Sequence, residues 1–363
     1  MKRSCRIRPT FAVLTASIVL TSARVESQFT RHVPRGLDWF MSVPDENVLT
    51  EPKVRLGARL FSERRLSRNG TIACASCHDR NHAFADGRAI SIGIDGRRGT
   101  RSTPTLVNRG YGRTFFWDGR AGTLEEQVLG PIENPTEMGS ELADVVQRLR
   151  RDPDYVRDFG SVFNEPVSAN SIAQVLASYV RTITSGDAPF DRFADGEREA
   201  LSTAAQRGLS IFRGKGRCSS CHVGPTFSDE AFHNTGVAWN GRALVDEGRG
   251  AITGLEVDRG AFKTPTLREI ARTAPYMHDG SFATLDEVID FYAAGGRPNP
   301  WLDREIRPLR LNAQDKSDLL ELLVSLSGTV EDGPNPLPVM FKASLFATST
   351  RLESETGTLT KSR

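Results

Sequence analysis

The chain has 363 residues, of which 38% are hydrophobic and 25% charged, and its formal net charge is +2 at pH 7. This length suits two or three domains of about 100–200 residues each, and the composition allows an ordinary hydrophobic core. Beyond the N-terminus, no stretch reaches the roughly 18 apolar residues that a membrane-spanning helix needs, so no internal membrane span is expected.

Residues 1–27 have the pattern of a secretory signal peptide, which predicts export. Basic residues at positions 2, 3, 6 and 8 precede a mostly apolar run over 11–23. A cleavage site follows at Ala23 or Ser27; an uncleaved anchor is the alternative. Removal of this segment takes away five Lys or Arg and one Glu, which leaves 42 basic and 44 acidic residues and a net charge of −2. Nucleic acid is therefore not an expected partner.

Four features follow one another in the first half of the chain. A helical stretch ends in GARLF (57–61), and then come CASCH (74–78), TPTL (103–106) and FFWDGRAGTLEE (115–126). A further helix, predicted over 170–186, closes this half.

The same features return in the same order in the second half: GLSIF (208–212), CSSCH (218–222), TPTL (264–267) and YMHDGSFATLDE (276–287). The last phrase repeats D-G-x-x-x-T-L-[DE]-E, so that positions 115–126 correspond one by one to positions 276–287. Trp117 stands before the Asp in one copy and His278 in the other. Two copies of the same four features, each spread over a stretch as long as a domain, indicate two homologous domains and not a solenoid. Asn312, with Asp315 at the third position, predicts the start of a last helix, which Gly328 ends.

The two C-x-x-C-H pentapeptides indicate covalent attachment of two c-type haems. In each, the thiols of Cys74 and Cys77, or of Cys218 and Cys221, are spaced to form thioethers to the vinyl groups of one porphyrin. The adjacent histidine, His78 or His222, then reaches the iron as proximal ligand. A four-cysteine zinc site, a thioredoxin-like pair and two short-loop disulfides are the alternatives.

The sequence therefore predicts a mainly α protein of two homologous c-type cytochrome-like domains, each with one covalent haem. After the signal peptide (1–27), an N-terminal haem domain is expected over 28–187 and a C-terminal haem domain over 188–340, with the boundary in the polar stretch 185–199. Residues 341–363 are expected to form a flexible tail.

Three segments together resemble the bacterial di-haem cytochrome c peroxidases and their MauG-like, methylamine-utilisation relatives over roughly residues 35–330. These segments are CASCHDRNHAFADGR, RSTPTLVNRGYGRTFFWDGRAGTLEEQVLGPIENPTEMG and FKTPTLREIARTAPYMHDGSFATLDEVIDFY. The resemblance implies that the first haem, on His78, is peroxidatic. It makes Glu137 the general acid–base group, for which a solvated loop carboxylate is the ordinary alternative, and Gln127 the residue that orients peroxide.

The resemblance makes the second haem, on His222, an electron-transfer haem and places Trp117 between the two haems. Core packing is the ordinary role of such a tryptophan, and both roles are compatible. The peroxidases carry a Met ligand where this chain has Tyr292, a residue that the MauG-like enzymes also carry there. Tyr292 is the expected sixth ligand of the second iron, and Met277 is the alternative. A tyrosinate ligand would lower the reduction potential and a thioether would raise it.

Two further departures from the peroxidase pattern concern histidine and calcium. No His lies between Asp86 and TPTL, and His82 is expected to be an exposed loop residue, so the first haem is expected to be open without prior reduction. The resemblance also implies a Ca²⁺ ion held by backbone oxygens of Thr273 and Pro275. The Asn that supplies the third ligand in the family is replaced by Ser102 here.

The expected function is a periplasmic di-haem peroxidase that reduces hydrogen peroxide with electrons from a small cytochrome c or cupredoxin. One alternative is a MauG-like oxidase that uses peroxide to oxidise a partner protein or small molecule. The other is a non-catalytic di-haem electron-transfer cytochrome. No membrane span is expected after signal cleavage, and the sequence leaves open whether the protein is a homodimer.

Overall fold

The computed structural model describes residue 29 and residues 32–334. Within them the chain is mainly helical, as predicted, and its strands have only two or three residues. The predicted signal peptide (1–27) lies outside the described residues, and so does the predicted tail (341–363). None of the helices in the described part is long and apolar enough to cross a membrane.

The helices before residue 190 are α1 (Glu51–Phe61), α2 (Leu124–Glu133), α3 (Leu142–Arg150), α4 (Pro153–Phe163), α5 (Ala169–Val180) and the short α6 (Pro189–Ala194). The later helices are α7 (Thr203–Arg213), α8 (Gly250–Thr253), α9 (Leu285–Ala293) and α10 (Ala313–Val324). Two antiparallel ladders pair β1 (Thr184–Gly186) with β4 (Thr329–Glu331), and β2 (Phe232–His233) with β3 (Phe262–Lys263). Each CxxCH motif begins as a single 3-10 turn.

A pair of helices in close contact organises each half of the chain. Helix α1 packs against α5, and α7 packs against α10. In each pair a glycine allows the backbones to approach closely: a Cβ on Gly57 would lie 1.9 Å from the Val175 carbonyl oxygen, and one on Gly208 would lie 2.0 Å from that of Asp318. The two G-x-x-[LI]-F motifs of the sequence are thus the contact points of equivalent helix pairs.

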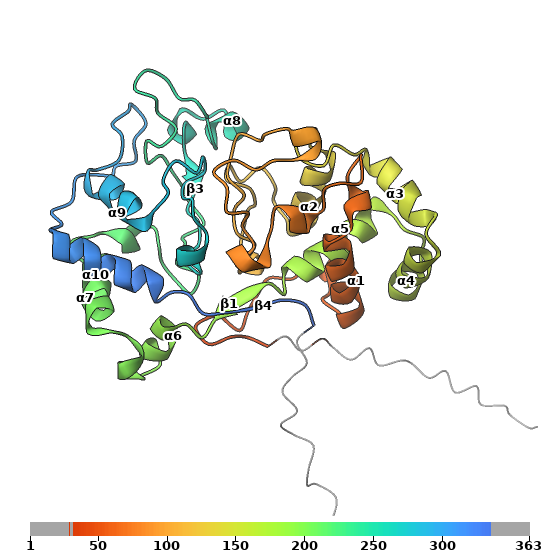
Figure 1. Cartoon of the computed structure of the whole chain (residues 1–363), viewed down its shortest axis with the longest axis horizontal. Helices are drawn as coiled ribbons and strands as arrows, with labels where there is room; N and C mark the ends of the chain where they lie inside the picture. The colour runs from red at the N-terminus through yellow and green to blue at the C-terminus, as the bar shows by residue number, and fades with distance from the viewer. Residues whose placement is uncertain (1–28, 30–31, 335–363) are drawn as a thin grey trace, which may run out of the picture.

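The buried apolar side chains form two separate clusters. One is drawn from residues between Val54 and Ile183, and the other from residues between Leu209 and Leu326. Figure 1 shows α1–α5 on one side of the molecule and α7, α9 and α10 on the other, with β1 and β4 between them.

The ends of the two closing helices differ in how well the sequence predicts them. Helix α10 begins as expected, because Asn312 and Asp315 form a reciprocal capping box with hydrogen bonds of 2.9 Å in both directions. Helix α5 ends at Val180, whereas the pattern predicted helix up to residue 186. The backbone of residues 184–186 instead pairs with β4 as β1, and this tertiary pairing overrides the local helical pattern.

The repeated D-G phrase forms the same turn twice. The amide of Phe115 donates to the Ala121 carbonyl at 2.9 Å, and that of Tyr276, the equivalent residue of the second copy, donates to the Phe282 carbonyl at 2.7 Å. Phe116 and Met277 hold the same left-handed position, with φ of 66° and 72°. Both phrases are therefore copies of one structural unit.

The two copies also exchange backbone hydrogen bonds across the seam between the halves. The Ser102 amide donates to the His278 carbonyl at 2.7 Å, and the Lys263 amide donates to the Trp117 carbonyl at 2.8 Å. Ser102 and Lys263 are equivalent residues of the two copies, and so are Trp117 and His278, so this exchange is reciprocal. The halves therefore meet at a pseudo-two-fold contact formed by the TPTL and D-G segments.

Candidate functional site

A cavity of about 840 Å³ runs along this seam and is lined by both CxxCH motifs. Its walls come from the helix pairs and from both copies of the TPTL and D-G segments. The residues that the sequence predicted for the two sites therefore lie along one continuous space.

The first motif holds its histidine in a defined orientation. The His78 amide donates to the Cys74 carbonyl at 2.9 Å, and the ring atom Nδ1 lies 2.9 Å from the Phe84 carbonyl oxygen. A carbonyl only accepts, so Nδ1 carries the proton and Nε2 keeps its lone pair free for a metal. Burial lowers the pKa of His78, which also favours the neutral ring.

The second motif repeats this geometry. The His222 amide donates to the Cys218 carbonyl at 2.9 Å, and Nδ1 lies 2.9 Å from the Phe227 carbonyl oxygen. In both copies the second Thr of TPTL supports the loop that supplies this carbonyl: Thr105 donates to the Ala83 carbonyl at 2.5 Å and Thr266 to the Thr226 carbonyl at 2.6 Å.

The four motif cysteines are free thiols in the structure. Burial raises the pKa of Cys74 and of Cys218 to about 12 and that of Cys77 to about 11. Disulfides are absent among them, and in the described part of the chain they do not gather into a four-cysteine metal site. Two neutral thiols beside an oriented neutral histidine, at the wall of a large apolar cavity, fit a covalent haem at each motif.

Gln127, predicted to orient peroxide, lies on helix α2, and Glu137, the predicted acid–base group, lies in the turn that follows this helix. Gln127, Pro131 and Glu137 all line the cavity. Glu137 is held by the Asn134 side chain, whose amide donates to Oε1 at 2.7 Å. The structure therefore brings Gln127 and Glu137 to the cavity that also holds the His78 motif.

Burial raises the pKa of Glu137, while the Arg120 guanidinium and the Asn134 hydrogen bond oppose this shift. Arg120 follows the first D-G and lies over Phe116, with its guanidinium carbon 3.5 Å from the ring centroid. Both Asp118 oxygens accept from it, at 3.0 and 2.9 Å. A carboxylate with a raised pKa beside a fixed cation can both accept and return a proton.

Trp117 also lines the cavity, at the seam between the halves. Its indole Nε1 donates to the Ser102 carbonyl at 2.9 Å, and its own carbonyl accepts from Lys263. The next residue, Asp118, is buried and accepts from Arg101 at 2.6 Å, and Arg101 also binds Asp246 of the second half at 2.7 and 2.8 Å. The tryptophan is therefore fixed by contacts from both halves.

The second site differs from the first at equivalent positions. Tyr292 on α9 follows the second D-G phrase at the same distance as Pro131 on α2 follows the first, so these two residues occupy the same place in the two copies. Both line the cavity. Proline has no side-chain donor atom for a metal, whereas tyrosine has a phenol oxygen. Burial raises the pKa of Tyr292. Met277 also lines the cavity, but it sits in the turn at the position equivalent to Phe116.

Known proteins are similar in sequence to this chain. A family described as di-haem cytochrome c peroxidase matches residues 51–199. The methylamine utilization protein MauG of Methylorubrum extorquens is 40% identical over 287 residues, which cover 78% of this chain and 80% of that protein. The cytochrome-c peroxidase IdrP1 of Pseudomonas sp. is 33% identical and covers 91% of this chain and 98% of its own. The chain belongs to the di-haem cytochrome c peroxidase family.

A solved structure shows the same fold. The crystal structure of a MauG-like protein associated with microbial copper homeostasis is 37% identical, with a TM-score of 0.75, and covers 82% of this chain and 95% of that one. As a di-haem cytochrome c peroxidase, this chain is an oxidoreductase of the peroxidase type, and the family description implies two haems.

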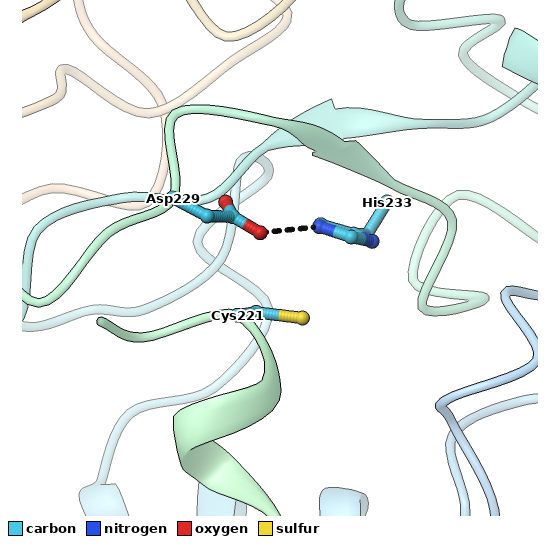
Figure 2. A group of neighbouring side chains, drawn as sticks. All are labelled: Cys221, Asp229 and His233. Carbon is cyan, nitrogen blue, oxygen red and sulfur yellow. Dashed lines mark hydrogen bonds and ion pairs between the residues drawn. The ribbon is translucent and has the colours of Figure 1, made fainter.

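Sequence reasoning missed one cluster of side chains in this di-haem peroxidase. Figure 2 shows the Cys221 sulfur beneath the paired side chains of Asp229 and His233. These three offer ligand atoms within 4.8 Å of one another and form the one such group of metal-binding side chains in the described residues. A thioether at Cys221 would remove the thiolate that a metal needs, so this cluster does not suit a metal ion once haem is attached. The spacing D-x-x-x-H after CSSCH was the available signal.

The pKa of His233 is raised to about 10, first by a hydrogen bond to the Cys221 sulfur and also by Asp303 and Asp229, against the opposing effect of burial. The first of these causes needs a free Cys221 thiolate, so we attribute the protonation of His233 in a haem-loaded protein to the two carboxylates.

The remaining predicted residues lie as follows. His82 is exposed, as expected, with its Nδ1 3.0 Å from Asp79. Thr273 and Pro275 line the cavity, and Ser102, the third residue considered for calcium, also lines it. No cluster of carboxylates in the described residues lies beside them, so a cation there would depend on backbone carbonyls, the Ser102 hydroxyl and water.

Proposed function

We propose that this chain reduces hydrogen peroxide to water with electrons from a small donor protein, a cytochrome c or a cupredoxin. One peroxide, two electrons and two protons give two water molecules. The observation that carries the proposal is the contrast between the copies: the first site has Glu137, Gln127 and the inert Pro131, whereas the second has Tyr292 in the place of Pro131.

The side chains of the first site would divide the work of breaking the O–O bond. Haem on His78 would supply the open iron position and the electrons for this step. Ionised Glu137, oriented by Asn134, would take a proton from one peroxide oxygen and return it to the other, which leaves as water. Gln127 would hold the peroxide by hydrogen bonds, and Phe116 with Arg120 stacked on it would limit the entry of bulk water.

Electrons would enter through the second haem on His222 and pass Trp117. The indole is suited to this role because contacts from both halves fix its orientation at the seam. Tyr292 would occupy the sixth position of the second iron, so that peroxide reacts at the first haem alone.

The test is peroxide-dependent oxidation of ferrocytochrome c by the di-haem protein and its Glu137→Gln variant. Loss of the acid–base group should lower kcat/KM for peroxide by about 10²–10⁴-fold. Glu133→Gln, an exposed carboxylate at the end of the same helix, is the matched control and should be unaffected. Full activity of Glu137→Gln would contradict the assigned role.

A MauG-like oxidation of a partner protein or small molecule is the second candidate, and Tyr292 favours it. A tyrosinate ligand would lower the reduction potential of the second haem and make it a poorer acceptor of electrons from a donor protein. A protein that consumes peroxide and persists in an oxidised spectral state, yet does not oxidise ferrocytochrome c, would support this candidate. Absence of any spectral response to peroxide would leave only the electron-transfer cytochrome.

The organisation of the chain completes the proposal. We propose haem domains over 28–187 and 188–340, supported by the two apolar clusters. We also propose export to the periplasm, supported by the basic and apolar segments within 1–27.

We further propose a Ca²⁺ ion at the carbonyls of Thr273 and Pro275, supported by their position in the wall of the cavity at the seam. Calcium removal should then alter the spectrum of the protein, and no change would dismiss the site.

A further inference from the structure

His233 is held between two carboxylates. Its Nδ1 lies 2.6 Å from an Asp303 oxygen, and its Nε2 lies 3.0 Å from an Asp229 oxygen. An ionised carboxylate only accepts hydrogen bonds, so each ring nitrogen must donate and the ring must carry both protons. The geometry therefore requires an imidazolium cation, about one-fifth exposed, within a cage of two anions.

In the described residues of the first half, no histidine takes the place of His233; the cation nearest in the sequence to the corresponding aspartate is Arg88, whose charge acts on the pKa of Cys77. Phe84 and Phe227 supply the carbonyls that accept from the two proximal histidines. An aspartate stands two residues after each of them, Asp86 in the first half and Asp229 in the second. Each aspartate accepts a hydrogen bond from the backbone amide two positions further along the chain, at 3.0 and 2.9 Å. These aspartates are therefore equivalent. Four residues beyond Asp229 stands His233, whereas four residues beyond Asp86 stands Ile90.

The cation links the loop that follows CSSCH to the segment that follows α9. Asp229 belongs to the loop that follows CSSCH, and Asp303 belongs to the segment that follows α9, the helix of Tyr292. The Asp303 amide also donates to the Asn234 carbonyl at 2.9 Å, so this segment is anchored beside β2. The Cys221 sulfur lies within 4.8 Å of ligand atoms of both His233 and Asp229. Figure 2 shows these three side chains facing one another.

We infer that His233 is a positioning residue of the second haem site, a fixed cation that braces the Cys221 loop against the segment after α9 and raises the reduction potential of the haem held there. The inference rests on the proposed haem attachment at Cys218 and Cys221, and not on the peroxidase reaction. With His233 present, the cage of two carboxylates and one cation has a net charge of −1; without it the charge is −2. Negative charge near the iron favours the ferric state and lowers the potential.

The experiment compares three variants of the full di-haem protein. His233→Ile places the residue of the first copy in the second, and Asp303→Asn removes one anion. All titrations are made at about pH 5.5, below the ordinary histidine pKa of about 6.5, so that the His233 ring beside Asp229 keeps its charge in Asp303→Asn. His82→Asn is the control, because it breaks an exposed His–Asp pair beside the first haem motif. Haem content is measured first, by pyridine haemochrome and mass, and the midpoint potentials of both haems are then followed by optical titration and electron paramagnetic resonance.

We expect the second haem to shift to a lower potential in His233→Ile and to a higher potential in Asp303→Asn, with the first haem unchanged and no shift in His82→Asn. Potential shifts of opposite sign in the two variants would identify an electrostatic effect. Loosening of the Cys221 loop would shift the potential of the second haem in the same direction in both variants. Shifts of the same sign, or none, would overturn the inference. Should His233→Ile lose the second haem, Asp303→Asn decides alone: a higher potential supports the inference, and any other result overturns it. Wild-type protein without haem at Cys218 and Cys221 would instead refute the proposed cofactor.

Discussion

Trp117 and His278, which occupy the same position in the two copies of the repeated phrase, are joined through the backbone of a single residue, Ser102. The indole N–H of Trp117 donates to the Ser102 carbonyl at 2.9 Å, and the Ser102 amide donates to the His278 carbonyl at 2.7 Å. The His278 ring in turn stacks on Phe262, with centroids 3.6 Å apart and an angle of 11° between the rings. A continuous contact thus crosses the seam from the first half to the second.

This contact predicts a specific defect in Trp117→Phe. Phenylalanine keeps the apolar ring but loses the hydrogen bond to Ser102, so the unfolding free energy should fall by only about 1 kcal/mol. Donor-dependent turnover should fall by about tenfold or more if electrons pass through the Trp117 indole. A tenfold loss corresponds to about 1.4 kcal/mol added to the barrier of that step. Stopped-flow mixing should show that the reaction of peroxide with the protein persists while re-reduction slows.

Trp239→Phe is the control for this prediction. Trp239 makes an edge contact with Trp301, at 6.1 Å between centroids, and is not among the residues that line the cavity. Equal losses of turnover in both variants would show that Trp117 acts only through packing.

The sequence predicts the parts of this molecule that are written as local patterns. The CxxCH motifs, the capping box at Asn312 and the turn shared by the two D-G phrases need no tertiary information. Alignment of the two copies also shows that Tyr292 and Pro131 are equivalent positions, and this correspondence can be read from the sequence alone. The end of α5 at Val180 could not be predicted, because it depends on pairing with β4, which belongs to the far end of the described chain. The cage around His233 was hidden for the same reason, since Asp303 lies 70 residues from it.

The activity should depend on pH through Glu137. The carboxylate must be ionised to accept the peroxide proton, so kcat/KM should rise with pH through the pKa of this group. Burial raises that pKa, so the acid limb should lie above the ordinary carboxyl value of about 4.3. The charged group that opposes this shift is Arg120, so Arg120→Leu should move the limb to still higher pH, whereas Arg120→Lys should keep it near the wild-type position. A limb that is the same in all three proteins would show that another group titrates.

The ligand of the second haem can be decided by two substitutions. Tyr292→Phe removes the phenol oxygen and should abolish the low-spin signal of the second haem, whereas Met277→Leu should leave that signal intact. Tyr292→Met should restore a low-spin haem of higher potential, because a thioether favours ferrous iron. Optical and electron paramagnetic resonance spectra with redox titration measure both effects. Loss of the signal in Met277→Leu, and not in Tyr292→Phe, would assign the ligand to Met277.

The glycines at the contacts of the two helix pairs should contribute strongly to the unfolding free energy. A methyl group on Gly57 or Gly208 would lie within about 2 Å of a backbone carbonyl oxygen, so Gly57→Ala and Gly208→Ala should each lower the unfolding free energy by about 1–3 kcal/mol or more. Gly160 in α4 is exposed and has no atom within 4 Å of the added Cβ, so Gly160→Ala should instead stabilise the helix by about 0.5–1 kcal/mol. Denaturant unfolding of the haem-loaded protein measures these differences.

The same variants test whether the halves unfold as separate domains. Gly57 packs α1 on α5 and Gly208 packs α7 on α10, so each substitution should weaken one half first. The two haems would report on the two halves, because a haem with an open sixth position and one with a sixth protein ligand have different visible and magnetic spectra. Gly57→Ala should therefore bring forward the loss of the first haem signal alone, and Gly208→Ala that of the second. A single shared transition, shifted equally by both substitutions, would show that the seam holds the halves together as one cooperative unit.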